Sequence, residues 1–186
     1  MDPDDVMTLM TADMEKALNH TLQEFANIHT GKASPSMVEN VTVEAYGSQM
    51  QLKSLAAIST PDNRTIAITP FDPSTAKDII KGIQVANLGF NPVQNGDKVH
   101  VPLPELTGDR RKELAKTCHG HSEQGKVGIR SARRDAMDAI KAAEKEKAIT
   151  EDDRKRYEKD IQKETDAFVK RIDDALKAKE NELLNG

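Results

Sequence analysis

The sequence predicts an α+β protein in which a long antiparallel three-helix bundle carries a small inserted α+β module. Two observations lead to this fold class. Apolar residues recur at spacings of three and four over three long stretches, one near the N-terminus and two in the C-terminal half. The residues between the first two stretches instead alternate in short runs separated by Pro, Gly and Asn. Because each long helix has only a narrow apolar stripe, the three are expected to bury these stripes against one another.

The first helix is expected to begin at Asp2-Pro3, since Asp accepts hydrogen bonds from free amides and Pro suits the first helical position. It should run for about 28 residues, with Gly31 as its C-terminal cap. Pro35 forces Ser34 away from helical geometry, so Lys32 to Ser36 is predicted to be a joint. The apolar stripe of this helix consists of Met7, Met10, Met14, Ala17, Thr21, Phe25 and Ile28.

The middle of the chain is expected to form short strands and one helix. Asp72-Pro73 should open that helix, which runs to about Ala86 and turns Ala76, Ile79, Ile80 and Ile83 inward. Gly89 to Gly96 is rich in turn residues and is predicted to be a loop. The predicted strands are Val41–Val43, Gln49–Leu52, Leu55–Thr60, Arg64–Thr69 and Lys98–Val101.

A second joint precedes the last two helices. Val101 to Leu106 reads VPLPEL, and its two prolines deny it helical geometry, which indicates a rigid strut or hinge. The second helix should start after Thr107 and end near Lys145, and Thr150 with Asp153 should cap the third. The stripe of the second helix is Leu114, Cys118, Ile129, Ala132, Ala136, Ile140 and Ala143; that of the third is Tyr157, Ile161, Phe168, Ile172, Leu176 and Leu183.

One face of the second helix carries a line of cations, although the formal charge of the chain is −4. At 100° per residue, Lys126, Arg130, Arg133, Arg134 and Lys141 fall in one arc of roughly 100°, away from the apolar stripe. Lys112 and Lys116 continue the same arc toward the start of the helix. We call these seven residues the cationic ridge. Arginine outnumbers lysine at its centre, which favours phosphate binding over a merely solvated face.

Other classes of site are disfavoured by composition. Aromatic residues make up 3% of the chain and Trp is missing, which argues against base stacking on a single strand. Cys118 should be a small buried thiol, because it cannot converge with His119 and His121 on one metal ion from a single helix. No catalytic constellation or cofactor motif is recognised, so we expect neither an enzyme nor a cofactor. A lone cysteine, an acidic N-terminal stretch and no apolar run of membrane-spanning length favour a cytoplasmic protein.

Several segments resemble the ribosome recycling factor family. They are IHTGKASPSM at residues 28–37, VPLPELT followed by RRKEL at the second joint, GIRSARRDAMD within the second helix, and ITEDD before the third. The resemblance extends over the whole chain in the order of the family. It implies an L-shaped, two-domain protein with a three-helix bundle and an inserted β/α/β domain. It also implies a monomer that acts with elongation factor G and GTP to release the post-termination ribosome from messenger RNA.

The resemblance assigns roles to particular residues. Arg130, Arg133 and Arg134, with Lys126 nearby, match arginines that contact large-subunit ribosomal RNA, and Arg110, Arg111 and Lys112 match the RRK segment. The departures from the family pattern are His29, Lys32 and His119, which stand where arginine or another basic residue is usual. The hinge strands match Thr30, Gly31, Lys32, Ala33 and Ser34, and Val101, Pro102, Leu103, Pro104, Glu105 and Leu106.

The expected domains are residues 1–30 with 106–186 for the bundle and 31–105 for the insertion. Two alternatives remain open at this point. A protein-interaction bundle of the co-chaperone kind would share the stripes and the insertion, but it would not need clustered arginines. A general binder of double-stranded RNA is disfavoured because the remaining surface is acidic.

Overall fold

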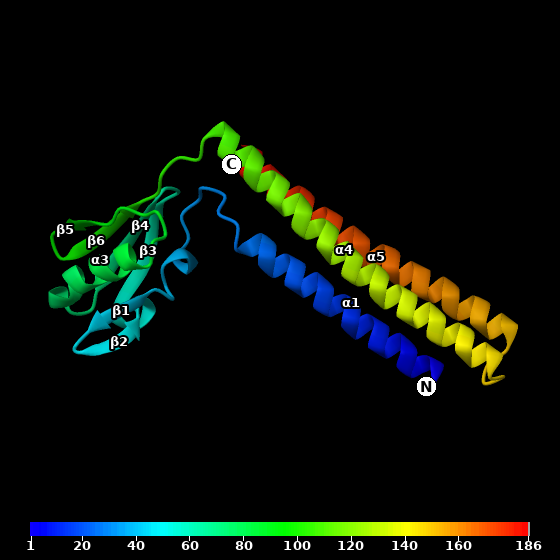
Figure 1. The fold of residues 1–186 in the computed structure, drawn as a ribbon. Coiled ribbons are helices and arrows are strands. Elements are labelled where there is room, and N and C mark those ends of the chain that lie inside the picture. Colours follow the sequence, from blue (N-terminus) through cyan, green and yellow to red (C-terminus); the bar gives the residue numbers. More distant parts are fainter. Residues whose placement is uncertain (186) are drawn as a thin grey trace. The chain divides into compact units, whose positions relative to one another are not determined.

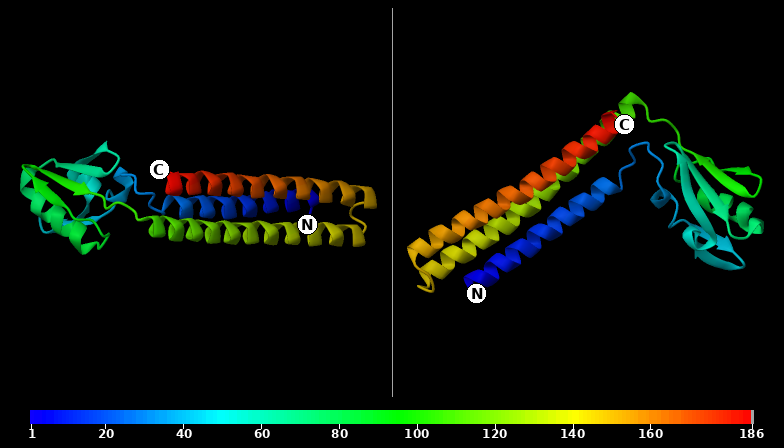
Figure 2. Two further views of the ribbon diagram at one scale, coloured as in Figure 1. Left: turned by 90° about the horizontal axis from the view of Figure 1, so that it is seen from above. Right: turned by 180° about the vertical axis from the view of Figure 1, so that it is seen from behind.

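The computed structural model describes residues 1–185, which divide into two compact units. One unit is Met1–His29 together with the chain from Gly108 onward, and the other is Thr30–Thr107. The first unit consists of three long helices, α1 (Pro3–Ala26), α4 (Gly108–Lys145) and α5 (Glu151–Asn185), which lie side by side in Figures 1 and 2. The predicted three-helix bundle is therefore confirmed.

Two polar contacts fix the direction of α1 in the bundle. The Tyr157 hydroxyl donates to Asp4 Oδ1 at 3.1 Å, and Thr11 Oγ1 donates to Glu164 Oε1 at 2.5 Å. In both pairs the two residues are 153 positions apart in the sequence, so α1 and α5 run parallel. The two contacts lie one heptad apart along each helix. Since a short connection joins α4 to α5, α4 is antiparallel to both (Figure 1).

The apolar stripes form the core of this unit, as the periodicity predicts. Met10 and Met14 of α1, Ile129 and Ile140 of α4, and Ile172 of α5 are buried in one cluster. A smaller cluster of Phe25, Cys118 and Leu183 lies toward the C-terminal end of α5. The stripe of α1 is centred slightly differently from the prediction: Val6 and Leu18 are buried, whereas Met7 and Ala17 lie at its edge.

The end of α1 differs from the prediction. The helix spans 24 residues and Asn27, not Gly31, is its C-cap. The Ile28 amide donates to the Phe25 carbonyl, and Ile28 still packs on the Phe25 cluster without being helical. Burial of an apolar side chain at the expected spacing thus does not require the helix to continue. Gly31, with φ of +84°, belongs to the following connection.

The second unit contains two antiparallel sheets and one long helix. Strands β1 (Thr42–Ala45) and β2 (Ser48–Gln51) pair through a two-residue turn, and α2 (Leu52–Leu55) follows. The other sheet has the order β3-β4-β6-β5, from β3 (Ala56–Asp62), β4 (Thr65–Pro70), β5 (Val93–Asn95) and β6 (Lys98–Pro102). Helix α3 (Ala76–Val85) follows a 3₁₀ turn at Pro73–Thr75, where the Asp72 side chain accepts from the Ser74 amide as expected of a cap.

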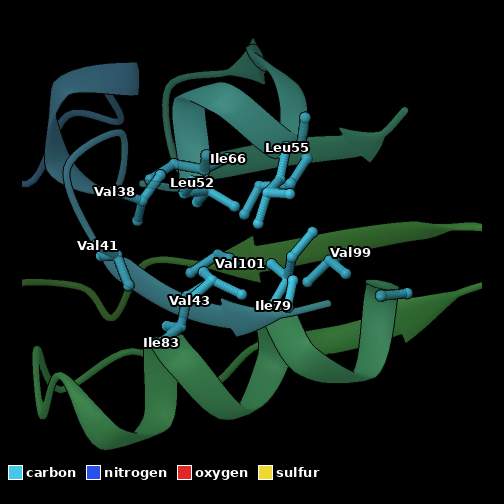
Figure 3. Packing of buried hydrophobic residues seen from close by; sticks show 14 of the residues in the cluster. Val38, Val41, Val43, Leu52, Leu55, Ile66, Ile79, Ile83, Val99 and Val101 are labelled. Atoms are coloured by element: carbon cyan, nitrogen blue, oxygen red, sulfur yellow. The ribbon is translucent and has the colours of Figure 1, made fainter. Parts of the chain in front are cut away.

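This unit has a core of its own. Figure 3 shows Ile79 and Ile83 of α3 directed toward Val43, Val99 and Val101 of the strands. Helix α3 approaches β1 closely at Gly82, where an added Cβ would lie 3.0 Å from the Thr42 carbonyl oxygen. Strand β5 falls within the stretch predicted to be a loop. Its three residues are exposed, so they carry no alternating pattern that could have indicated a strand.

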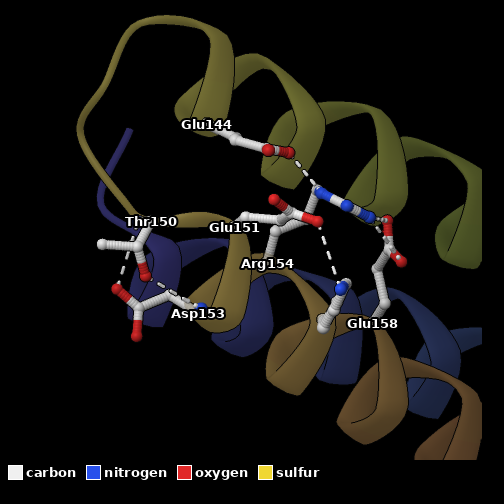
Figure 4. Close-up of polar contacts among 7 residues, drawn as sticks. Glu144, Thr150, Glu151, Asp153, Arg154 and Glu158 are labelled. Atoms are coloured by element: carbon white, nitrogen blue, oxygen red, sulfur yellow. Dashed lines mark hydrogen bonds and ion pairs between the residues drawn. The ribbon is translucent and has the colours of Figure 1, made fainter.

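The connection between α4 and α5 is held by a polar cluster (Figure 4). The Asp153 amide donates to Thr150 Oγ1 at 3.1 Å and the Thr150 amide donates to Asp153 Oδ2 at 3.2 Å, which confirms the predicted capping box. Arg154 then joins the two helices, because it pairs with Glu144 of α4 and with Glu158 of its own helix at 3.1 Å.

Parts of both joints are fixed to the β3–β4 turn. The Ala33 amide donates to the Asn63 carbonyl, and the Leu103 amide donates to the Arg64 carbonyl, each at 2.7 Å. The Arg64 guanidinium also pairs with Glu105 at 2.8 Å. Val101 and Pro102, predicted as hinge residues, lie in β6, and Val101 is fully buried. These two positions are therefore part of the sheet rather than of a mobile connection.

Candidate nucleic-acid interface

The cationic ridge lies on α4 outside the packed core. Arg130 and Arg134 are exposed, as are Lys112, Lys116 and Lys141. Within residues 1–185, none of these five cations forms a hydrogen bond or an ion pair. The neighbouring stripe residues Ile129 and Ile140 are fully buried, so the helix cannot rotate to hide the ridge. These five cations along one helix are the candidate contacts for phosphate.

The other two residues of the ridge lie at its border with α5. Lys126 forms ion pairs with Asp173 at 2.5 Å and with Glu123 at 3.7 Å, and its side chain is only 17% exposed. Its charge is therefore already neutralised, which makes it a poorer phosphate ligand than the arginines. Arg133 is half-buried, and its Nε donates to Gln162 Oε1 at 2.8 Å. Both α5 partners, Asp173 and Gln162, depend on how α4 packs against α5, which the helical projection of α4 alone does not show.

The RRK segment at the start of α4 divides into different environments. The Arg110 guanidinium forms an exposed ion pair with Glu113 at 3.0 Å, and such pairs contribute little to stability. Arg111 is half-buried, and its Nη1 donates to the Leu183 carbonyl at 2.7 Å, so it links the ends of α4 and α5. Lys112 points outward in line with the ridge. Of the three, Lys112 lies in the arc of the ridge, and contact of all three with ribosomal RNA stays a prediction.

The departures from the family pattern lie in different parts of the molecule: His29 and His119 in the bundle, Lys32 in the second unit. The pKa of His29 is lowered by desolvation and by the nearby Lys179 ammonium, so the imidazole is neutral at pH 7 and adds no charge. His119 is exposed on α4, and Lys32 is exposed in the second unit. Lysine at position 32 keeps a positive charge but lacks the planar fork of arginine.

The structure gives no support to a metal or nucleophile site around Cys118. The thiol is fully buried, and this burial raises the pKa of Cys118, which disfavours the reactive thiolate. Among residues 1–185, no three His, Cys, Asp or Glu side chains lie close enough to hold a metal ion. Over the same residues, no helix combines the length and apolar character that a membrane crossing would need.

Comparison with known proteins places these features in a family. The family model described as ribosome recycling factor matches residues 21–184. The ribosome-recycling factor of Akkermansia muciniphila is 44% identical over 186 residues, covering 99% of both chains. That of Rubrobacter xylanophilus is 43% identical over 182 residues, covering 97% of this chain and 98% of the relative.

Solved structures agree with these relatives. A solution structure of the ribosome recycling factor has a TM-score of 0.78 at 34% identity, covering 100% of this chain and 99% of the other. A second similar structure is the Thermus thermophilus recycling factor, described with Escherichia coli elongation factor G on the post-termination complex; its TM-score is 0.65 at 35% identity, with full coverage of both chains. Family match, relatives and fold all agree with the resemblance in the sequence, and the chain belongs to the ribosome recycling factor family.

Proposed function

We propose that this protein, together with elongation factor G and GTP, dissociates the post-termination ribosome from messenger RNA. The bundle binds large-subunit ribosomal RNA through the cationic ridge. The observation that carries this assignment is the set of outward cations on α4, centred on Arg130 and Arg134, that form no ion pair with a carboxylate within residues 1–185. The net charge of −4 would by itself repel phosphate. The line of cations on α4 provides a local attraction for phosphate in spite of it.

The protein acts mechanically rather than chemically. It works as a monomer in the cytoplasm, without a cofactor, and GTP hydrolysis belongs to the elongation factor. The two units move relative to each other about the joints at residues 30–34 and 101–106, of which Val101 and Pro102 are held in β6 and take no part in the movement. The bonds from Ala33 and Leu103 to the β3–β4 turn support a firm anchor on the second unit, so movement is concentrated between those bonds and the bundle.

The ridge assignment is tested with an Arg130→Ala/Arg134→Ala variant. Both side chains are exposed and lie outside the core, so the helical circular dichroism should not change. The variant should sediment less with purified ribosomes at moderate salt, and more of it should be needed for splitting with elongation factor G and GTP. Unchanged binding in this variant would refute the ridge assignment.

A protein-interaction bundle of the co-chaperone kind is the competing function. It would bind a protein client with little dependence on salt, because its contact would not release counterions from phosphates. Ribosome sedimentation at low and moderate salt separates these two functions. Competition by arbitrary duplex RNA tests the third possibility, because a general duplex binder would bind such RNA as well as it binds the ribosome.

A further inference from the structure

Arg133 is held differently from the other cations of α4. Its Nε donates to Gln162 Oε1 at 2.8 Å across the α4–α5 interface. No second hydrogen bond or ion pair of Arg133 is found within residues 1–185. A guanidinium has five N–H donors. The bond to Gln162 therefore occupies one side of the group and leaves the Nη1 and Nη2 fork unused.

The Gln162 amide is itself fixed. Its Nε2 donates to Asp166 Oδ1 at 2.8 Å, one helical turn along α5. Turning the amide over would bring its NH₂ group against the Arg133 N–H and its oxygen against the Asp166 carboxylate. Both contacts would then be repulsive, so Asp166 determines which end of Gln162 faces Arg133. Arg133, Gln162 and Asp166 thus form a chain of hydrogen bonds in which Arg133 donates to Gln162 and Gln162 donates to Asp166.

The choice of a neutral partner distinguishes Arg133 from the structural cations of the bundle. Arg154 is paired with two carboxylates, Glu144 and Glu158, and Lys126 is paired with Asp173. Those charges are neutralised within the protein. Glutamine supplies the same kind of acceptor oxygen without a negative charge, so Arg133 is oriented but keeps its full charge for an external anion.

We propose that Gln162 is a positioning residue that aims the free fork of Arg133 at an RNA phosphate and so makes α5 part of the interface. This inference rests on the proposed function, because it assigns an orienting role to a residue beside the ridge. Orientation matters for a bidentate contact, since a freely rotating guanidinium must be ordered when it binds and this ordering weakens affinity.

Two substitutions separate charge from orientation. Gln162→Glu keeps an acceptor at the same place but gives Arg133 an ion pair, which competes with the phosphate. One phosphate contact with a log–log salt slope of about −0.9 corresponds to a factor of about eight in affinity at 0.1 M salt. Gln162→Glu should therefore weaken ribosome binding about eightfold and reduce the magnitude of the salt slope by about one unit. Gln162→Met removes the acceptor but keeps the charge of Arg133, so it should weaken binding while leaving the slope unchanged.

The matched control is Gln23→Glu, which makes the same change of net charge at an exposed position on α1. If general repulsion were responsible, Gln162→Glu and Gln23→Glu would weaken binding equally, and the inference would be wrong. A second check combines Gln162→Glu with Arg133→Ala. In this background Gln162→Glu should cause no greater loss of ribosome affinity than Gln23→Glu does.

The result for Arg133→Ala alone distinguishes a wrong binding site at Arg133 from a wrong role for Gln162. If Arg133→Ala does not weaken ribosome binding, the fault lies in the proposed site at this residue. If Arg133→Ala weakens binding while both Gln162 variants bind like the parent, the site stands and the positioning role of Gln162 is overturned. Urea unfolding of each variant, followed by circular dichroism, checks that the bundle is intact.

Discussion

Among the glycines of α4, Gly125 leaves the least room for a side chain, and it gives a sharp test of the packing. A Cβ added to Gly125 would lie 2.2 Å from Thr21 Oγ1 and 3.0 Å from Ile172 Cδ1. Thr21 cannot easily yield, because it is buried, is β-branched and donates through Oγ1 to the Ala17 carbonyl at 2.8 Å. Gly125→Ala should therefore force a shift of α1 or of Ile172.

The expected magnitude is a balance of two opposing effects. Alanine favours a helix over glycine by about 0.8–1.0 kcal/mol. Overpacking of a filled core costs about 1–3 kcal/mol. Contacts with side chains of both other helices place Gly125→Ala near the upper end of that range, which leaves a net destabilisation of about 1–2 kcal/mol.

Gly120→Ala is the matched control on the same helix. An added Cβ at Gly120 meets no atom of residues 1–185 within 4 Å, so only the helix propensity remains. This variant should be stabilised by about 0.8–1.0 kcal/mol. Urea titrations monitored by circular dichroism at the helical band give both free energies of unfolding. If Gly125→Ala were as stable as Gly120→Ala, the described packing of α1 on α4 would be wrong.

Three further predictions concern the rest of the fold. Thr150→Ala removes one half of the capping box of α5 and should lower the free energy of unfolding by about 0.5–2 kcal/mol in the same titration. The pKa of Asp153 lies below its usual value of 3.8, chiefly because of the hydrogen bond with the Thr150 backbone amide and next because of the one with the Thr150 side chain. Asp153 therefore stabilises the fold above that pH and ceases to do so as the pH falls through its lowered pKa, so Asp153→Asn should be less stable than the parent at pH 7 but equal to it in strong acid. Gly82→Ala places a Cβ 3.0 Å from the Thr42 carbonyl oxygen, which is backbone and cannot rotate away. After the same subtraction of the helix-propensity gain, it should destabilise the second unit by about 1–2 kcal/mol, as followed by hydrogen exchange of the β1 and β4 amides. A parent-like result for any of the three would contradict the corresponding contact.

The sequence was sufficient to predict the bundle because helical periodicity records burial directly. Ile129, Ala136 and Ile172 were placed in the core from spacing alone, and the structure buries all three. The same projection separated Arg130 and Arg134 from the stripe, and both are exposed. The capping box at Thr150 was also predictable, since it depends on residues three positions apart.

Side-chain contacts between helices could not be predicted from the sequence. The pairing of Lys126 with Asp173 and of Arg133 with Gln162 depends on the register of α5 against α4, which the periodicity of either helix alone does not define. The attachment of Arg111 to the Leu183 carbonyl was missed for the same reason. The assignment of Val101 to a hinge gave too much weight to the two following prolines and too little to its own alternating strand pattern.

The central claim is that ribosome binding depends on phosphate contacts made by the cationic ridge, and its most direct test is the salt dependence of that binding. Affinity for purified ribosomes would be measured between 50 and 200 mM salt for the parent and for Arg130→Ala/Arg134→Ala. Each lost contact should reduce the magnitude of the log–log slope by about 0.7–0.9, so the double variant should bind with a slope shallower by about 1.4–1.8. Equal slopes for the two proteins would contradict the account, even if the variant bound more weakly at every salt concentration.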